Sequence, residues 1–446
     1  MSRLDLEGLN EVAISAAKKL GVDDAVALSS RSGNSMIRFA NNSVTVVTRV
    51  EESELAVYLA KSRRRALAST SNLEASAVRK FVDDLYSSME GLPESEYVPL
   101  PDRPSRYEPS KQGYDRRIES LEAELPGMAR TAIDSATAAG GKRSAGVISA
   151  GKGTVAILTT HGTRGTDSRT AITLNIRSFA EKEASGHGLS CSCSLSGFNP
   201  EEAGRRAGEG AKTMRNASEP EAGKYMLLLS PTVASNLVET VASAASAFSV
   251  DAGTSYLADK LGRKVAAPLF SLTDHGVTDG GFGGRVFDDE GTRTGSNKII
   301  EGGVLKSYLH NLTTARKWRV KSTGNAGFVS PHPWNLEIAP GDSDYEEMVA
   351  ETKRGIVLTS NWYTRFKNYR TGEFSTVPRD GAYLVERGRV VKPLKGMRMG
   401  DDLERMLSSV RLLSKRREWI QWWEVDTPTL CPWILVDGAK ITRAYG

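Results

Sequence analysis

Four carboxylates lie close together in one glycine-rich stretch of the sequence: Asp279, Asp288, Asp289 and Glu290. Carboxylate oxygens are the ligands that Mg²⁺ and Ca²⁺ prefer, so this stretch could hold a hard cation and support hydrolysis. Acidic residues beside glycine are also typical of turns. The residues by themselves leave both interpretations open, a metal-dependent hydrolase and a set of structural turns.

Zinc chemistry and nucleophilic chemistry have little support in the sequence. The five histidines are scattered singly, as His161, His187, His275, His310 and His332. No H-E-x-x-H helix and no G-x-S-x-G turn occurs. Cys191 and Cys193 form C-x-C, which on a strand places both side chains on one face and indicates core packing. With Cys431 the count is three, which predicts no disulfide framework and a reducing compartment.

Two glycine-rich segments come close to nucleotide-binding motifs but lack essential features. Gly146–Gly153 nearly matches a P-loop, yet Gly153 stands where Ser or Thr should contact Mg²⁺. Its flanking residues predict two strands around a tight turn instead of a strand followed by a helix. Gly280–Gly284 is not followed by a helix, so it does not predict a dinucleotide site.

The glycine-rich stretches have a second property, because glycine lets one backbone approach another closely. The two stretches are Asp274–Tyr308 and Ser322–Ala326. An exposed backbone edge can bind an extended peptide as an added strand. The residues predicted to line such a peptide cleft are Gly283, Gly284, Asp288, Glu290, Ser322, Gly324 and Asn325. Hairpin turns are the alternative interpretation.

The overall composition is that of a soluble globular protein. The 446 residues allow about two or three domains. The net charge of +5, from 59 basic and 54 acidic residues, is too small an excess to indicate a nucleic-acid binder. The sequence shows no signal peptide and no apolar window of about 18 residues, so we expect a cytoplasmic protein without a membrane span.

The pattern of the first part of the chain predicts an N-terminal α+β domain over residues 1–90. A helix over Leu6–Leu20 is followed by alternating strands up to Thr70 and by a second helix ending near Met89. Residues 91–113 contain five prolines and predict a linker, because proline interrupts both helix and central strand.

Residues 114–218 predict a middle α+β segment. A long helix over Tyr114–Ala139, kinked near Pro126, precedes strands over Ser144–Ser196 and a helix over Pro200–Thr213.

Residues 219–446 predict a large β-rich C-terminal domain. A buried strand over Tyr225–Ser230 leads into a helix from Pro231 to Phe248, and a late helix is expected over Leu403–Arg416. The expected fold class is therefore α+β: a small N-terminal α/β-type domain, a middle α+β segment and a large β-rich C-terminal domain.

The glycine-rich blocks are also where the sequence resembles the TldD/PmbA family. The matching stretches are Phe287–Thr292, Ile300–Leu309, Lys321–Ala326, Trp362–Phe366, Thr371–Thr376 and Pro378–Gly381, with Ala68–Ser71 and Glu219–Tyr225 upstream. The resemblance covers nearly the whole chain. It implies a cytoplasmic peptidase system of two related subunits that acts on peptides or unfolded polypeptides.

The resemblance also implies where this family's zinc site should be sought. The TldD-type subunit carries H-E-x-x-x-H on a helix, completed by a cysteine near the C-terminus, whereas the TldE/PmbA-type subunit lacks these ligands. Zinc would polarise a peptide carbonyl and activate water, with the Glu as general base. Val238 and Ser243 occupy the two histidine positions, only Glu239 is kept, and Gly396–Gly400 contains no cysteine.

What the resemblance implies is a TldE/PmbA-like subunit with no cofactor of its own. It would be non-catalytic and would pair with a TldD-like subunit that holds the zinc. A dimer is expected, and the sequence leaves open whether it is a homodimer or a heterodimer. Whether the chain is itself an enzyme stays open because Glu239 is present. The alternatives are an autonomous hydrolase that uses the carboxylate stretch and a DNA-associated regulator, and the small charge excess argues against the second.

Tryptophan is concentrated near the C-terminal end of the sequence. Four of the seven tryptophans lie there: Trp419, Trp422, Trp423 and Trp433. Because tryptophan is enriched at binding hot spots, this cluster predicts a subunit contact, with burial in the core as the alternative.

Overall fold

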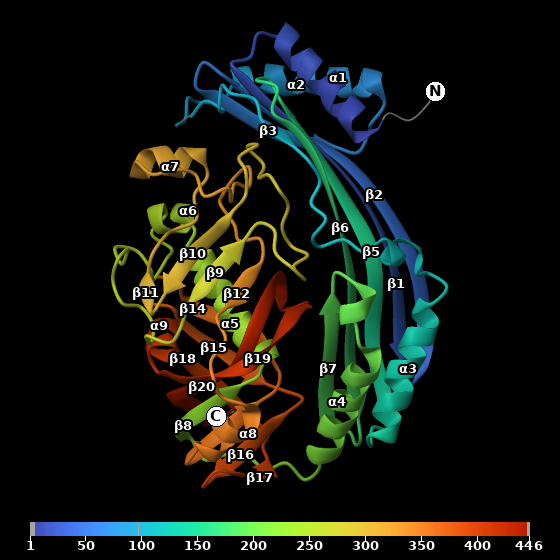
Figure 1. Ribbon diagram of the computed structural model, residues 1–446, viewed down its shortest axis with the longest axis vertical. Helices are drawn as coiled ribbons and strands as arrows, with labels where there is room; N and C mark the ends of the chain where they lie inside the picture. The colour runs from blue at the N-terminus through green and yellow to red at the C-terminus, as the bar shows by residue number, and fades with distance from the viewer. Residues whose placement is uncertain (1–4, 97, 444–446) are drawn as a thin grey trace.

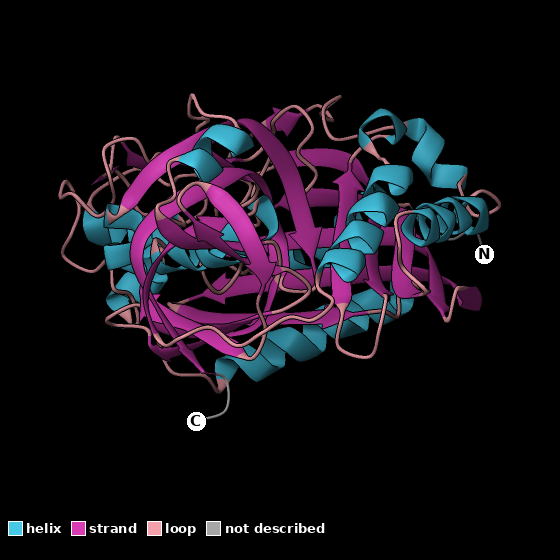
Figure 2. Ribbon diagram, turned by 90° about the horizontal axis from the view of Figure 1, so that it is seen from below, coloured by secondary structure: helices cyan, strands magenta, loops and turns pink. Residues whose placement is uncertain are grey.

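A computed structural model describes residues 5–96 and 98–443 of the chain (Figure 1). Within these residues the N-terminal half forms a seven-stranded β-sheet and the C-terminal half a thirteen-stranded one. The long, curved strands of the first sheet lie beside the C-terminal half (Figure 1). In the view from below, helices run along the curved strands (Figure 2). The predicted α+β class with a large β-rich C-terminal region is confirmed.

The first sheet has the strand order β3-β2-β1-β5-β6-β4, with β7 paired to β6. Its strands are β1 (Asp24–Ala40), β2 (Ser43–Lys61), β3 (Arg64–Thr70), β4 (Arg106–Tyr107), β5 (Arg143–Thr159), β6 (Arg164–Phe179) and β7 (Ser185–Ser192). Every pairing is antiparallel except that of the short β4 with β6. Strand β1 pairs with β5 from Val26 to Phe39, so the sheet is continuous from the first region of the chain to the middle one.

Two helix pairs cover this sheet at opposite ends of its long strands. Helices α1 (Leu6–Lys19) and α2 (Ala75–Glu90) pack on one end, and Asp5 caps α1 by accepting a hydrogen bond from the backbone N–H of Gly8. Helices α3 (Leu125–Ala138) and α4 (Pro200–Thr213) pack on the other end. The long strands therefore connect two small hydrophobic cores.

Several sequence predictions in this half were wrong in detail. The helix predicted over Tyr114–Ala139 is a short 3₁₀ helix (Arg116–Ser120) followed by α3. Pro126 lies in the first turn of α3, where its missing N–H leaves no bond unmade, so it starts the helix instead of kinking it. No tight turn interrupts Gly146–Gly153, which lies inside the single long strand β5 and therefore cannot form a P-loop.

The second sheet is assembled around β8 (Gly223–Leu229) and β20 (Val425–Arg443). Strand β8 lies between β13, to which it is parallel, and β20, to which it is antiparallel. The remaining strands are β9 (Leu272–His275), β10 (Ser296–Glu301), β11 (Val304–Leu305), β12 (Leu336–Ile338), β13 (Arg354–Leu358), β14 (Asn361–Asn368), β15 (Glu373–Pro378), β16 (Ala382–Glu386), β17 (Arg389–Pro393), β18 (Met397–Asp402) and β19 (Val410–Trp422).

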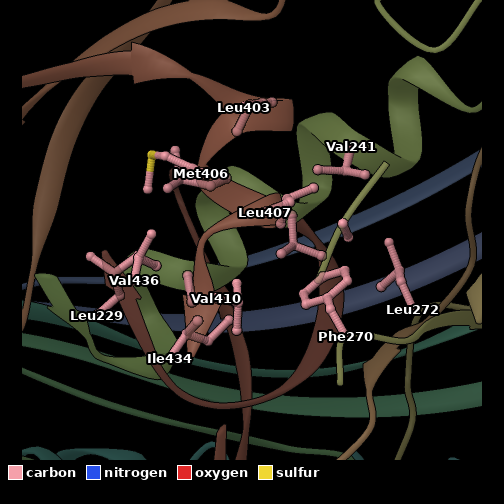
Figure 3. Close-up of a cluster of buried hydrophobic side chains, with 14 of the residues drawn as sticks. Leu229, Val241, Phe270, Leu272, Leu403, Met406, Leu407, Val410, Ile434 and Val436 are labelled. Carbon is pink, nitrogen blue, oxygen red and sulfur yellow. The ribbon is translucent and has the colours of Figure 1, made fainter. Parts of the chain in front are cut away.

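The helices of the C-terminal half are short apart from one. They are α5 (Pro231–Ala244), α6 (Ala247–Asp251), α7 (Leu312–Trp318), α8 (Tyr345–Ala350) and α9 (Leu403–Ser408). The main core packs α5 against α9 and the strands. Figure 3 shows Val241 of α5, Met406 of α9 and Ile434 of β20 converging with Phe270, which lies just before β9. Helix α5 is buried along most of its length and is the element around which this half is built.

The late helix predicted over Leu403–Arg416 is present only in its first part. Helix α9 ends at Ser408, and from Val410 the chain continues as β19 in antiparallel pairing with β20. The helix predicted from Pro231 to Phe248 is likewise divided, because α5 ends at Ala244 and α6 follows. Tertiary strand pairing decides these boundaries, and local periodicity does not contain it.

Among residues 5–96 and 98–443, no helix is long and apolar enough to cross a membrane.

Candidate functional site

Helix α5 carries the positions at which the resemblance expects zinc chemistry. Ser230 precedes it and caps its first turn, accepting a hydrogen bond from the backbone N–H of Val233 over 3.3 Å. Pro231 occupies the first turn, where proline fits a helix well. The helix packs against β20 and is apolar on most of its surface, which explains its burial.

The three positions that the resemblance singles out on α5 lie in different environments. Val238 is 2% exposed and belongs to the main core. Glu239 is half-buried, and its Oε1 accepts a hydrogen bond of 2.6 Å from the backbone N–H of Thr427. Ser243 is exposed. Burial raises the pKa of the Glu239 carboxyl, and the hydrogen bond from Thr427 opposes that rise.

A polar network on the same helix was missed by the sequence analysis. The buried Asn236 accepts hydrogen bonds at Oδ1 from Asn361 Nδ2 over 3.0 Å and from Thr364 Oγ1 over 2.5 Å. Its Nδ2 donates to the carbonyl oxygen of Glu424 over 2.7 Å. Thr376 completes the network through bonds from Asn361 and Thr364. An asparagine between the apolar residues Ala234, Leu237 and Val238 of the helix was the available signal.

This network joins two of the sequence segments that carry the family resemblance. Thr364 lies in Trp362–Phe366, and Thr376 ends Thr371–Thr376. Thr364 is hydrogen-bonded both to Asn236 and to Thr376, so these two segments meet beside α5. Their polar residues hold the helix against β14 and β15.

The residues considered for a late cysteine ligand are buried in the core. Cys431 lies on β20, is fully buried, and burial raises the pKa of its thiol to about 12. Met397 and Met399, inside the Gly396–Gly400 stretch, are also buried in the main core. Full burial among apolar side chains is typical of a cysteine that packs in a core.

The glycine-rich blocks fold together into a single substructure, which we call the loop layer (residues 274–294 and 322–335). Asp274 is its centre and is fully buried. Its Oδ1 accepts hydrogen bonds from the backbone N–H groups of Trp334 and Asn335, over 2.6 and 3.2 Å. Its Oδ2 accepts from Asn325 Nδ2 over 2.6 Å, and Asn325 also donates to the carbonyl oxygen of His332. Burial raises the pKa of Asp274 to about 6.

Asp288 joins the two segments of the loop layer. Its Oδ1 accepts hydrogen bonds from the backbone N–H groups of Glu290 and Thr292, over 3.0 and 2.8 Å. Its Oδ2 accepts from the N–H of Ala326 over 3.1 Å. The side chain is fully buried, and burial raises its pKa to about 7. These bonds fix a turn and tie it to the segment after Asn325.

The predicted glycines allow close backbone approach, but within the loop layer itself. A Cβ atom on Gly284 would overlap the carbonyl oxygen of Gly276. Gly324 has a φ of 70°, and a Cβ there would overlap the carbonyl oxygen of Arg293. Gly283 donates its N–H to Asn335 Oδ1 over 2.8 Å. Ser322 belongs to a turn, where its Oγ accepts a bond from the Gly324 N–H over 3.3 Å.

The four carboxylates of the possible cation site have separate partners. Asp279 is exposed and accepts a hydrogen bond from Gln112 Nε2, whereas Asp289 is ion-paired with Arg285. Asp288 is occupied by backbone N–H groups. The described part of the chain contains no group of three or more His, Cys, Asp or Glu side chains able to hold a metal ion.

Glu290 differs from its neighbours because it faces a cavity of about 730 Å³. The cavity lies between the first sheet, the segment from Leu92 to Leu100, and the C-terminal elements α6 and α7. Glu290 Oε2 accepts a hydrogen bond of 2.8 Å from the backbone N–H of Leu312. Burial, followed by repulsion from Asp288, raises the Glu290 pKa to about 8.

The four C-terminal tryptophans do not form one patch. Trp419 packs near Phe282 of the loop layer, and Trp433 packs against Tyr345 of α8. Trp422 is 8% exposed, with its ring 4.9 Å from that of His187 on β7. Trp423 is 57% exposed. Only Trp423, among the four, presents most of its surface to solvent.

Two regions of the chain match models of known protein domains. Residues 107–215 match the model of the PmbA/TldA metallopeptidase central domain, and residues 222–443 match that of the C-terminal domain. The chain belongs to the PmbA/TldD family. A metalloprotease of Methanocaldococcus jannaschii is 34% identical over 203 residues, which are 43% of this chain and 44% of that protein.

A second PmbA/TldD relative is metalloprotease PmbA of Escherichia coli O157:H7, which is 29% identical over 188 residues. These cover 42% of this chain and 40% of that protein, so the chain aligns with less than half the length of either relative. The crystal structure of TldE from Thermococcus kodakarensis has a TM-score of 0.87 and covers 97% of this chain and 100% of that one. At 20% identity this likeness shows a common fold.

The donor set on α5 does not fit the zinc site expected for a TldD-type member of the PmbA/TldD family. Valine has no donor atom, and Val238 is enclosed by the core. Ser243 is exposed while Val238 is buried, so the two side chains do not face one space. Glu239 stands at the position of the general base and not of a ligand, and a structural or catalytic zinc ion needs at least three protein ligands.

Proposed function

We propose that this chain is the TldE/PmbA-like subunit of a TldD/TldE-type cytoplasmic peptidase complex. In this proposal the complex acts on peptides or unfolded polypeptides, and a TldD-like partner supplies the zinc. The chain shapes the peptide channel and stabilises the active subunit, without cleaving peptide bonds itself.

The observation that carries the proposal is the pair Val238 and Ser243. One is buried in the main core and the other is exposed, and neither side chain is a zinc ligand of the usual kind. The likeness in fold to TldE from Thermococcus kodakarensis supports the same type of subunit. The loop layer supports a scaffolding role, because its glycines and carboxylates bind its own backbone.

The test is to purify the chain alone and together with a TldD-like partner encoded in the same genome. Zinc content is measured by elemental mass spectrometry, and hydrolysis is followed on an unfolded polypeptide. We expect the isolated chain to hold far less than one zinc per molecule and to be inactive. The two-subunit complex should hold zinc and cleave the substrate.

Stoichiometric zinc in the isolated chain, together with hydrolysis by that chain alone, would overturn the proposal. Replacing Ser243 with Ala provides a matched control, because Ser243 is exposed and should contribute nothing to zinc content or to activity of the complex. Loss of zinc from the complex on this replacement would show that the position still acts as a ligand.

A further inference from the structure

The cavity beside Glu290 has the size and lining of a ligand site. Its volume of about 730 Å³ lies within the usual range of roughly 300–1,000 Å³ for small-molecule pockets. Apolar side chains form much of the wall, contributed by both halves of the chain: Val26, Leu67, Leu100, Phe248, Phe328 and Val329. Such a wall suits an apolar group of a ligand, and the few charged residues determine which charged group the same ligand can carry.

The basic groups of this cavity already have partners. Lys317 pairs with Asp251 over 3.0 Å. Arg65 donates from Nε to Ser95 Oγ over 2.9 Å. An anionic ligand would have to compete with these bonds.

Glu290 is the least exposed of the acidic groups that line the cavity, and one of its carboxyl oxygens is an unused acceptor. Its Oε2 binds the Leu312 N–H, whereas its Oε1 has no hydrogen-bond partner among residues 5–96 and 98–443. Asp288 and Asp289, just before it in the chain, add negative potential, although Asp289 is ion-paired with Arg285. A cation beside Glu290 would offset this repulsion, favour the ionised carboxylate over the protonated form that the raised pKa otherwise favours near neutral pH, and bind the free oxygen.

The surroundings of Glu290 favour an amine over a metal ion. Hard cations take six or more oxygen ligands, and the described part of the chain gathers no such set of carboxylates here. The Tyr58 and Phe328 rings are stacked with centroids 6.3 Å apart, and both line the cavity. An ammonium group on an apolar molecule matches one carboxylate beside aromatic and aliphatic walls.

We propose that this cavity binds the amino-terminal end of a peptide, with the ammonium group against Glu290 and an apolar first side chain against Phe328 and Val329. The inference rests on the proposed peptide-processing function for its choice of ligand. This cavity would be a substrate contact separate from the α5 region, and the chain would recognise the free amino terminus of the peptide there.

Peptide binding to the isolated full-length chain tests the inference without zinc or partner. The probe is a tetrapeptide that begins with leucine and carries a dye at its C-terminus, prepared with a free or an acetylated amino terminus. Fluorescence anisotropy gives both affinities. A charge-assisted hydrogen bond predicts that the free amine binds about tenfold more tightly than the acetylated form.

Glu290→Gln should reduce affinity for the free amine to that of the acetylated peptide and leave the latter unchanged. Glu96→Gln is the matched control, because Glu96 is exposed at the same cavity, and it should alter either affinity by less than about twofold. Phe248→Ala removes a wall residue that is 46% exposed, and it should weaken binding of the leucine-first peptide relative to a glycine-first one.

Three results would overturn the inference: equal affinity for the free and acetylated peptides, a retained preference in Glu290→Gln, or no binding of either peptide. Because these measurements use neither zinc nor hydrolysis, they fail or succeed separately from the two-subunit proposal. A chain that binds zinc and cleaves peptides alone could still recognise the amine, and a zinc-free chain could fail to do so.

Discussion

The loop layer and helix α5 both contain acidic residues that are withdrawn from solvent, yet these carboxylates have different partners. In the loop layer, Asp274 and Asp288 are fully buried and accept hydrogen bonds from backbone N–H groups of separate segments. On α5, Glu239 is half-buried and accepts one bond from the Thr427 backbone. Removing the first kind of carboxylate leaves several buried donors unpaired, whereas removing the second leaves one.

The contrast teaches which acidic residues hold the fold and which are free for chemistry. The loop layer uses its carboxylates to replace a regular ladder of backbone hydrogen bonds. Helix α5 has satisfied its own backbone, so its side chains are available for packing, for the Asn236 network and for contacts with the hairpin that joins β19 to β20.

The largest expected effect is on the loop layer. Asp288→Ala deprives the N–H groups of Glu290, Thr292 and Ala326 of their acceptor. We expect the free energy of unfolding to fall by about 3–5 kcal/mol, measured from the shift in the urea midpoint. Asp279→Ala, at an exposed carboxylate, should change it by less than about 0.5 kcal/mol. Equal effects of the two replacements would show that the hydrogen bonds of Asp288 do not stabilise the loop layer.

The next effect separates Trp422 from Trp423, which lie where β19 turns into β20. Trp422→Ala should destabilise the isolated chain by about 3 kcal/mol, because a buried ring packed on His187 is lost. Trp423→Ala should leave its thermal midpoint nearly unchanged, since Trp423 is 57% exposed.

The same pair tests the predicted subunit contact. If Trp423 is a hot spot, its replacement weakens assembly with the partner by about tenfold or more, as measured by mass photometry over a dilution series. An unchanged assembly mass at every concentration would leave the C-terminal tryptophans with a core role alone.

A pH effect is expected at the edge of the loop layer. Burial and the neighbouring Asp288 raise the Glu290 pKa to about 8, whereas a glutamate in the unfolded chain titrates near about 4.3. Between these values the folded state holds a proton that the unfolded state has lost, so stability is greatest at low pH and falls as pH rises toward about 8.

Glu290→Gln should therefore reduce the fall in the free energy of unfolding between about pH 5 and 8 by roughly 1–2 kcal/mol, measured by urea denaturation at each pH. The groups that face Glu290 are Asp288 and Asp289 on its own loop, Arg65 on β3, Tyr58 on β2 and the Leu312 N–H of α7. Asp279→Asn is the control and should keep the slope of the unchanged chain. An unchanged slope in Glu290→Gln would assign the titration to another group.

The sequence predicted the elements whose signals are local. The helix over Pro200–Thr213 was predicted with the bounds that the structure has, because proline starts it and its apolar face repeats at helical spacing. Strand β8 was predicted from its short apolar run, and the start of α5 from Pro231. Helices α7 and α8 were missed, although capping boxes at Asn311 and Asp344 were local signals for both.

Features that depend on distant partners could not be predicted in this way. Residues 410–416, the first part of β19, were predicted as helix because the pairing of β19 with β20 is not a local property. At the candidate site, the glycines predicted close backbone approach, but which backbone they approach became clear only from the fold. The peptide cleft itself stays a prediction. The division of the chain at residues 91–113 also stays a prediction, and the first sheet runs across it.

The smallest expected effect is at Glu239 and bears most directly on the comparison. Gln keeps an oxygen that can accept the Thr427 N–H, so Glu239→Gln should change the free energy of unfolding by less than about 1 kcal/mol. If the partner supplies catalysis, peptide hydrolysis by the complex should stay within about twofold of the unchanged complex, with the same pH profile.

The outcome at Glu239 is informative because its environment also suits a base. Burial raises its pKa, which brings a carboxylate toward the range in which general bases work. A working general base contributes about 10²–10⁴-fold to rate, so a loss of that size in Glu239→Gln, with zinc content intact, would make this chain catalytic. Glu239→Ala distinguishes structure from chemistry, since it removes the Thr427 bond as well and should lower stability by about 1 kcal/mol further without a further loss of rate.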